Sequence, residues 1–208
     1  MRIAREGWPF IIGALVVLVV LAVAHLGVLA LVWLVITFWV VAFFRDPLPT
    51  GPFDPRVLLA PADGKVVSII ETDEPAFFQD RALRVSIFMN VFDCHVNRYP
   101  AAGVVRYRHY NTGHFGHAAD EKASLENEQS SVGVETEHGK MLVRQIAGLV
   151  ARRIVTDHGV GTRVDQAERL GMIRFGSRVD LFLPPGTPLR VQVGDRTRVA
   201  RTVVAAWK

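Results

Sequence analysis

Histidine and cysteine are the residue types in this chain best suited to bind a metal ion. The chain has seven histidines and one cysteine. His114 and His117 lie in the stretch HYNTGHFGH, and Asp93, Cys94 and His95 are adjacent in FDCHVNR. Zinc ligands usually occur in pairs such as Cys-x-x-Cys or His-Glu-x-x-His, and neither pattern is present in the sequence. The sequence therefore favours polar loop histidines and predicts no metal site.

Serine and cysteine could instead act as nucleophiles. The sequence has no Gly-x-Ser-x-Gly turn, and FGSRV around Ser177 matches only half of that pattern. Cys94 and His95 are neighbours in the chain, so on a strand their side chains would point to opposite faces. An ordinary serine or cysteine hydrolase is therefore disfavoured.

Gly176 and Ser177 lie between two strand-like runs in the stretch RFGSRVDLFLP. A Gly-Ser pair in this position is typical of a turn. The pair also has a chemical use, because glycine leaves its carbonyl carbon unhindered and permits backbone angles that bring the next hydroxyl onto that carbon. The spacing alone fits both interpretations.

The chemical interpretation is a self-cleavage. Attack by the Ser177 hydroxyl would move the acyl group of Gly176 from nitrogen to oxygen and form an ester. β-Elimination would then release the upstream chain and leave dehydroalanine. Dehydroalanine is an enamine, and hydrolysis through its imine tautomer would give ammonia and an N-terminal pyruvoyl group. Such a reaction requires a base and oxyanion donors, which the fold must supply.

The elements that must position these residues begin with a long apolar segment. Nearly every residue from 8 to 44 is apolar, whereas one membrane-spanning helix needs only ~20 such residues. His25 and Gly27 interrupt the run near its middle, which predicts two short helices in a hairpin, with one long tilted helix as the alternative. The run is too long for a cleaved signal peptide, and it lacks the polar face of a soluble helix.

The flanking charges indicate the side of the membrane. Arg2 and Arg5 precede the apolar run and Arg45 follows it, and basic flanks favour the cytoplasm. A hairpin therefore predicts a cell-membrane protein with its remaining domain on the cytoplasmic side, whereas a single span would place that domain outside. The lone Cys94 cannot form an internal disulfide, which fits a reducing compartment.

The net charge is +4 and the sequence pI is about 9.6, but the arginines are scattered along the chain. For a domain tethered to a bilayer, anionic lipid head groups are a better partner than nucleic acid. The sequence leaves the oligomeric state open, including a homo-oligomer.

After the apolar segment the chain consists of short β-rich runs. The Pro- and Gly-rich stretch RDPLPTGPFDP marks a linker. We therefore divide the chain into a membrane-anchoring helical hairpin at residues 1–45, a linker at residues 46–56 and a mostly β domain, barrel-like or sandwich-like, at residues 57–208. Strands are predicted at residues 65–70, 83–89, 104–110, 130–136, 140–146, 151–155, 172–175, 178–183 and 197–207.

Five motifs follow the apolar segment in a fixed order. They are APADGKV (60–66), FMNVFDCHVNRYPAAG (88–103), ENEQ (126–129), QIAGLVARRI (145–154) and ERLGMIRFGSRVDLFLP (168–184). This ordered set, which covers nearly the whole chain, resembles the short form of phosphatidylserine decarboxylase, a pyruvoyl enzyme made as a proenzyme. Each motif alone is weak, but the ordered set is specific.

The resemblance implies cleavage between Gly176 and Ser177 into a β chain, residues 1–176, and an α chain, residues 177–208, which stay associated. Ser177 would become the covalent pyruvoyl cofactor. Its ketone would form a Schiff base with the serine amine of phosphatidylserine. The protonated imine and the neighbouring amide carbonyl would accept the charge left when the carboxylate leaves as carbon dioxide, and the product would be phosphatidylethanolamine. The expected role is therefore a lyase of phospholipid biosynthesis.

The resemblance also assigns two further catalytic residues. His95 matches the first histidine of the family's Asp-x-His motif and is the candidate proton donor to the α-carbon, with a loop histidine bonded to Asp93 as the structural alternative. Asp63 matches an aspartate that assists self-cleavage in longer members, with a turn aspartate before Gly64 as the alternative.

The chain departs from longer members at Arg98. Those members carry a second histidine there, which acts as the base in self-cleavage, and arginine stays protonated. His95 could serve both steps, or His114 or His117 could supply the base; the sequence does not choose. Asn127 could orient a carbonyl or end a strand.

Three other functions compete with this interpretation. They are decarboxylation of another serine-headed lipid, a membrane-tethered β-domain adaptor without enzymatic activity, and a self-cleaving hydrolase that keeps serine as its terminal nucleophile. QIAGLVARRI resembles a lipoyl-type strand pair, but it has no lysine to carry a prosthetic group.

Overall fold

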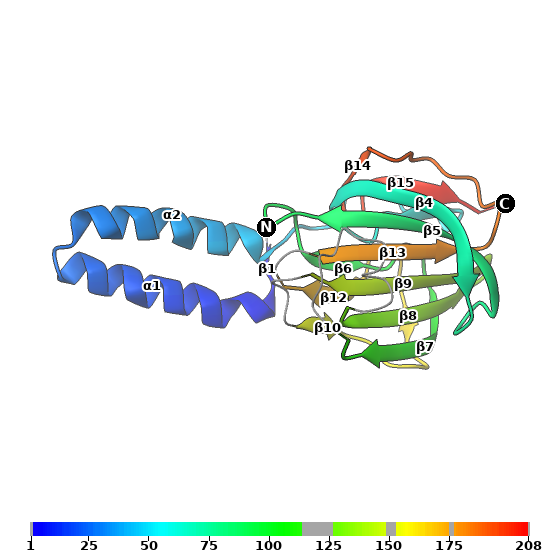
Figure 1. Ribbon diagram of the computed structural model, residues 1–208, viewed down its shortest axis with the longest axis horizontal. Helices are drawn as coiled ribbons and strands as arrows, with labels where there is room; N and C mark the ends of the chain where they lie inside the picture. Colours follow the sequence, from blue (N-terminus) through cyan, green and yellow to red (C-terminus); the bar gives the residue numbers. More distant parts are fainter. Residues whose placement is uncertain (1, 114–126, 149–152, 175–176, 208) are drawn as a thin grey trace. The chain divides into compact units, whose positions relative to one another are not determined.

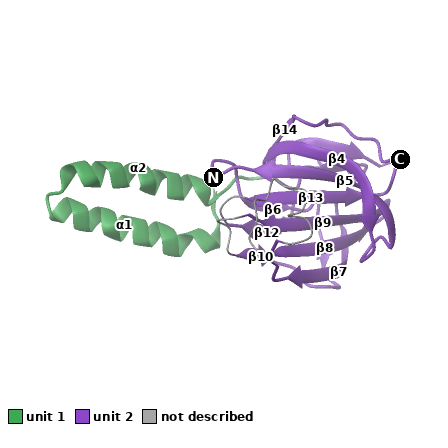
Figure 2. Ribbon diagram, viewed as in Figure 1, with its two compact units in different colours: residues 1–48 green, residues 49–208 purple. Residues whose placement is uncertain are grey.

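The computed structural model describes residues 2–113, 127–148, 153–174 and 177–207. The chain divides into two compact units, Met1–Leu48 and Pro49–Lys208 (Figure 2). The first unit is helical and the second is built from strands, so the predicted mostly β fold with an N-terminal helical segment is confirmed. The domain and linker boundaries given above remain a prediction.

The first unit is a hairpin of two apolar helices, α1 (Trp8–Val23) and α2 (Gly27–Phe43). His25, with φ of 56°, turns the chain between them, so the apolar run is not one continuous helix. The indole nitrogen of Trp33 donates to the carbonyl of Ala14 at 2.8 Å and links the helices. Residues Arg5–Val23 are long and apolar enough to span a membrane, with a mean hydropathy of 2.3.

The two ends of the hairpin lie together. The short 3-10 helix η1 (Arg5–Gly7) precedes α1. Strand β1 (Arg2–Ile3) pairs antiparallel with β2 (Arg45–Asp46), and the amide of Ala4 donates to the carbonyl of Phe44 at 2.8 Å. The chain therefore enters and leaves the apolar segment at the same end of this unit.

The second unit contains a curled antiparallel sheet of eight strands (Figure 1). Its spatial order is β11 (Arg163–Val164), β7 (Gly103–Asn111), β8 (Gln129–Thr136), β9 (Gly139–Ala147), β13 (Ser177–Leu183), β5 (Asp80–Met89), β4 (Gly64–Glu74) and β14 (Arg196–Thr197). The register shifts between Val66 and Ser68 and between Val105 and Tyr107, and such bulges increase the local bend of a sheet.

Two smaller sheets complete the unit. One has the order β10 (Ile154–Thr156), β12 (Arg169–Ile173), β6 (Val96–Arg98), and the other pairs β15 (Val203–Ala206) with β3 (Val57–Leu59). Strands β10 and β12 also approach β8 and β9 of the large sheet. The three-stranded sheet therefore lies next to the middle of the eight-stranded one.

The core is formed by one face of the large sheet. Because side chains alternate along a strand, Val179, Leu181 and Leu183 of β13 share a face, and all three belong to the main apolar cluster. Their cross-strand neighbours Val85 and Ile87 lie in the same cluster. This alternation matches the hydrophobic pattern from which the strands were predicted.

The opposite face of β13 carries buried charges. Arg178 and Asp180 are almost fully buried and form an ion pair, with Nε 2.9 Å from Oδ1. A second pair joins Arg144 Nη2 to Glu74 Oε1 at 3.1 Å. Strand β13 is therefore buried on both faces, which is unusual for a strand that holds two charged residues.

The C-terminal strand prediction was wrong. Instead of one strand over residues 197–207, the chain forms β14 and β15, separated by a turn in which Ala200 has φ of 51°. A backbone in that region cannot continue a strand. The short strands β3 and β6 were not predicted. The predicted strands at 151–155 and 172–175 lie partly outside the described residues.

The Arg178–Asp180 pair gives a stability prediction. Replacing Asp180 with asparagine should lower the free energy of unfolding by about 3–5 kcal/mol, because the buried Arg178 charge loses its counter-ion. Urea unfolding of the purified protein in detergent, followed by tryptophan fluorescence, measures the loss. The control is Glu71→Gln, which breaks the exposed Arg81–Glu71 pair and should cost less than about 1 kcal/mol. Equal losses in the two variants would contradict the role given to the buried pair.

Candidate functional site

Ser177 is the first residue of β13 and is fully buried. It pairs with Met89 of β5 on one side and with Ala147 of β9 on the other. Residues directly opposite each other in an antiparallel sheet project from the same face. Met89 and Ala147 belong to the main apolar cluster, so the Ser177 side chain points into the core face of the sheet. Its hydroxyl has no hydrogen-bond partner within the described part of the chain.

The chain reaches Ser177 from a different sheet. Strand β12 ends at Ile173, so only Arg174, Phe175 and Gly176 separate it from β13. Gly176 itself lies outside the described residues. The predicted cleavage point is therefore at the crossing between the three-stranded and the eight-stranded sheet. Ser177 begins a paired strand, so it is not the turn residue that the Gly-Ser pattern alone would favour.

His95 is brought close to this crossing. It is fully buried and directly precedes β6, and its carbonyl accepts a hydrogen bond from the amide of Ile173 at 3.3 Å. Its ring Nδ1 lies 3.0 Å from the carbonyl oxygen of Asp93. Because a carbonyl only accepts, Nδ1 carries the proton of the neutral ring and the lone pair is on Nε2. The geometry therefore prepares Nε2 to accept a proton.

The turn before His95 is held by side chains. Asp93 Oδ2 accepts from the amide of Asn90 at 2.9 Å, and Asn90 Oδ1 accepts from the amide of Phe92 at 2.8 Å. Asp93 Oδ1 also lies 3.5 Å from Arg196 Nη1. The alternative expected for His95, a bond to Asp93, is thus present, but it is made by Nδ1 to the Asp93 backbone and not to the Asp93 carboxylate.

Asp63 fixes the same segment from the other side. Its Oδ2 accepts from the amide of Cys94 at 3.3 Å, and its Oδ1 accepts from the amide of Val199 at 2.7 Å. Asp63 therefore joins the residue before His95 to the chain after β14. The structure brings Asp63 and His95 together through the backbone of Cys94. This contact is more specific than that of a turn aspartate before Gly64.

Arg98 has a structural contact. Its Nη1 donates to the carbonyl of Ala167 at 2.9 Å, and its amide donates to the carbonyl of Pro61 at 3.0 Å. The guanidinium thus supports the chain before β12, and as a permanent cation it cannot accept a proton. The other candidate bases, His114 and His117, lie outside the described residues.

Asn127 supports the strand beside Ser177. Its Nδ2 donates to the carbonyl of Ala147 at 2.8 Å, and the amide of Ala147 donates to the carbonyl of Glu128 at 2.9 Å. Tyr110 donates its hydroxyl to the Glu128 carboxylate. Burial, with a smaller contribution from Glu128, raises the pKa of Tyr110 to about 12, so the phenol stays protonated at neutral pH. Asn127 therefore orients the backbone of the strand opposite Ser177.

A chain of polar side chains crosses the core next to Ser177. Asn97 of β6, Gln145 of β9 and Ser130 of β8 are fully buried, and Thr156 of β10 is partly buried. Gln145 Nε2 donates to Asn97 Oδ1 at 2.8 Å, and Asn97 Nδ2 lies 3.6 Å from the sulfur of Met89, which pairs with Ser177. None of these four residues was predicted from the sequence.

The signal for this polar chain was present in the sequence but ambiguous. Gln145 lies in the predicted strand 140–146, where the alternation could equally place it on a solvent-exposed face, and Asn97 lies in a run too short to show any alternation. Among the described residues, no three His, Cys, Asp or Glu side chains are grouped to hold a metal ion. The described residues bury the Ser177 hydroxyl on the core face of the sheet, place His95 at the end of β12 and place the Asn97 amide against Met89, the cross-strand partner of Ser177.

Comparisons with known proteins identify the family of the chain. The family model for phosphatidylserine decarboxylase matches residues 36–205. The phosphatidylserine decarboxylase proenzyme of Symbiobacterium thermophilum is 46% identical over 203 residues, which cover 97% of this chain and 94% of that protein. The proenzyme of Nitrosomonas eutropha is 43% identical, over 99% of this chain and 95% of its own length. That of Burkholderia cenocepacia is 44% identical, over 98% and 95%. The chain belongs to the phosphatidylserine decarboxylase family.

Proposed function

We propose that this chain makes its own carbonyl cofactor by breaking the Gly176–Ser177 bond and then decarboxylates phosphatidylserine at the membrane surface. The observation that carries this proposal is the placement of Ser177, whose buried hydroxyl lies at the crossing between two sheets, with His95 held beside the end of β12. The products of cleavage are a β chain of residues 1–176 and an α chain of residues 177–208.

Family membership confirms the coarser predictions. The enzyme class is a carboxy-lyase acting on phosphatidylserine, in lipid biosynthesis, and the cofactor of these proenzymes is a pyruvoyl group derived from serine. A bilayer-associated protein is supported by the apolar helix at Arg5–Val23.

The self-cleavage needs Ser177 to lose its proton as it attacks. We assign this proton to His95 Nε2, because the hydrogen bond from Nδ1 to the Asp93 carbonyl leaves Nε2 as the basic nitrogen. The bond that forms joins Ser177 Oγ to the Gly176 carbonyl carbon, and the bond that breaks joins that carbon to the Ser177 nitrogen. Asp63 acts as a positioning residue, because it holds the Cys94 amide.

The site fits a cofactor made from this residue. Ser177 lies on the core face of the sheet, away from bulk water, and the flanking strands fix its backbone on both sides. The ketone of a pyruvoyl group would supply an electron sink for the carboxylate that leaves as carbon dioxide. The protein supplies the rest: His95 is placed to hold or return a proton, and the buried surroundings exclude water from the reaction.

The α chain should remain bound after the backbone is cut. Residues Ser177–Leu183 pair with β5 along their whole length, and Ser177–Phe182 also pair with β9. Val179, Leu181 and Leu183 contribute buried apolar surface to the same core. Cleavage and loss of the Ser177 nitrogen alter only the first residue of β13, so the pairing of the residues after it and these apolar contacts remain.

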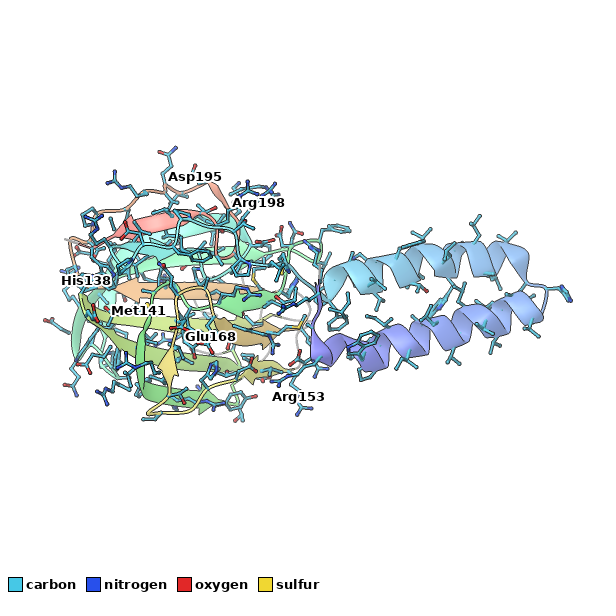
Figure 3. All side chains as sticks on the ribbon, turned by 180° about the vertical axis from the view of Figure 1, so that it is seen from behind. His138, Met141, Arg153, Glu168, Asp195 and Arg198 are labelled. Carbon is cyan, nitrogen blue, oxygen red and sulfur yellow. The ribbon has the colours of Figure 1, made fainter. Side chains whose placement is uncertain are left out.

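The hairpin supports a cytoplasmic active site. Both of its ends lie together through the β1–β2 pair, and Arg2, Arg5 and Arg45 are at that end. Basic residues near membrane segments favour the cytoplasmic side. In the second unit, Arg196 and Arg198 are exposed near the Asp93 turn, and Arg198 projects from the surface in Figure 3. These cations suit an anionic lipid head group.

The first test of this proposal is Ser177→Ala. The variant should stay as one chain on a denaturing gel and release no carbon dioxide from phosphatidylserine vesicles, because it lacks the attacking hydroxyl. The wild-type protein should give two chains, the smaller one blocked to Edman degradation. A Ser177→Ala chain that still splits at this bond would contradict the serine chemistry, and a smaller chain with a readable N-terminal serine would indicate a hydrolase instead.

The second test separates a base from a positioning residue. His95→Gln should slow self-cleavage by roughly 10²–10⁴-fold, the usual contribution of a general base. Asp63→Asn keeps the shape of the side chain and should slow it less, because only the position of the His95 segment is loosened. The matched control is His158→Gln, which removes a histidine that contacts Glu168. Wild-type cleavage and turnover in His95→Gln would remove His95 from the site.

The third test concerns the side of the membrane. Sealed inside-out and right-side-out vesicles are treated with a protease that cuts exposed loops such as residues 192–194. The β domain should be digested only in inside-out vesicles, and in both preparations once detergent is added. Digestion in right-side-out vesicles would contradict the hairpin topology and favour a single span.

A further inference from the structure

We propose that Asn97 donates a hydrogen bond to the oxyanion that forms when Ser177 attacks the Gly176 carbonyl, and that Gln145, Thr156 and Ser130 hold the Asn97 amide in the orientation this requires. The inference rests on the proposed self-cleavage and deepens it. The assignment of His95 as the base accounts for the Ser177 proton. The present inference names the group that stabilises the negative charge on the Gly176 carbonyl oxygen.

The polar chain has a fixed direction. Thr156 Oγ1 donates its single proton to Gln145 Oε1 at 3.1 Å, so the 2.8 Å contact between Ser130 and Thr156 must be a donation from Ser130. Gln145 Nε2 then donates to Asn97 Oδ1 at 2.8 Å. Every hydrogen bond in the series therefore points toward Asn97, and successive bonds of one direction polarise each other.

This direction fixes the Asn97 amide. Its oxygen is taken by Gln145, so its NH₂ group is the end turned toward Met89, with Nδ2 3.6 Å from the sulfur. A thioether is a weak acceptor, and the amide nitrogen carries two protons. The Asn97 NH₂ group is thus a buried donor that faces a poor acceptor, which costs folding stability. Such a donor is available to a stronger acceptor that forms during the reaction.

The same contacts place the amide at Ser177. Met89 is the cross-strand partner of Ser177, and Gln145 pairs with Val179, two residues further along β13. Residues 177 and 179 share a face of the strand, and so do their partners on β5 and β9. Asn97 therefore projects from β6 into the core side on which the Ser177 hydroxyl lies. His95 lies two residues before Asn97, and its carbonyl is hydrogen-bonded to the amide of Ile173 at the end of β12.

The four side chains of the polar chain come from both sheets. Ser130 and Gln145 are directly paired on β8 and β9, whereas Asn97 and Thr156 come from β6 and β10 of the small sheet. Apolar side chains would fill this buried space without demanding partners for each polar atom. An oxyanion site requires a donor that is oriented before the charge develops. The polar chain meets this requirement, because its other three side chains orient the Asn97 amide.

The test is Asn97→Asp in the full-length protein, expressed and followed by denaturing gel. Aspartate keeps the acceptor for Gln145 but removes both N–H donors. Self-cleavage should become roughly 10²–10³-fold slower, the effect of losing one oxyanion donor. Hydroxylamine, which cuts esters, should release no α chain from the stalled protein, because the acyl shift itself is blocked.

A second variant acts at a distance. Thr156→Val removes the proton donated to Gln145 without touching Asn97, and it should slow cleavage by roughly 3–10-fold as the amide loses its orientation. The control is Ser86→Ala, which removes a buried hydroxyl from the other face of the same sheet and should cleave at the wild-type rate. Thermal unfolding midpoints identify variants that have not folded, and Thr156→Val decides the question if Asn97→Asp is one of them.

Three outcomes would overturn the inference. They are wild-type cleavage in Asn97→Asp, wild-type cleavage in Thr156→Val, and a stalled Asn97→Asp protein that hydroxylamine opens, since the ester would then have formed without the donor. Failure of the proposed function is a separate result, because the wild-type chain would then remain uncut at Ser177.

Discussion

The pairing of β13 with β5 on one side and β9 on the other is the interaction on which the rest of the structure depends. It fixes the backbone of Ser177 at the centre of an eight-stranded sheet, and it holds that residue only four positions after β12, which belongs to a different sheet. Strand β12 is paired with β6 and β10, and β13 is paired with β5 and β9, so both strands next to the predicted cleavage point belong to hydrogen-bonded ladders. Cutting the chain at this crossing alters only the first residue of β13 and leaves the pairing of the residues after Ser177 in place.

The same pairing explains why so many polar groups are buried around one strand. On one face of β13, the Arg178–Asp180 pair is compensated within the strand itself. On the other face, Ser177 lies opposite Met89 in the main apolar cluster, and the Asn97 amide contacts the sulfur of that methionine. Burying a polar or charged group costs folding free energy unless the group has a partner. The two faces of β13 differ in how this cost is met. The ion pair is neutralised and structural, whereas the amide relay ends on a donor that is oriented toward the reacting residue.

The sequence predicted the fold class and most long strands, because alternating apolar residues in β5, β8, β9 and β13 follow directly from burial of one sheet face. It did not predict β6, whose three residues include Asn97 and Arg98, because a strand this short has no readable period. It also joined β14 and β15 into one strand, since nothing in the local pattern marks the left-handed turn at Ala200. For the site, the ordered motifs pointed to Ser177, His95 and Asp63, but the contact from Asp63 to the Cys94 amide joins residues far apart in the chain. The Asn97–Gln145–Thr156–Ser130 series was missed for the same reason: it exists only after four strands from two sheets converge.

The central claim is that the chain is cut at Ser177 and yet held together by β13. Mass spectrometry of one active preparation, recorded under native and then denaturing conditions, tests it most directly. The account predicts a single species under native conditions and two chains after denaturation. The smaller chain should begin at residue 177, with a mass below that of its encoded sequence by the mass of ammonia. An active preparation that remains one unbroken chain after denaturation would contradict the claim, and so would two chains that already separate under native conditions.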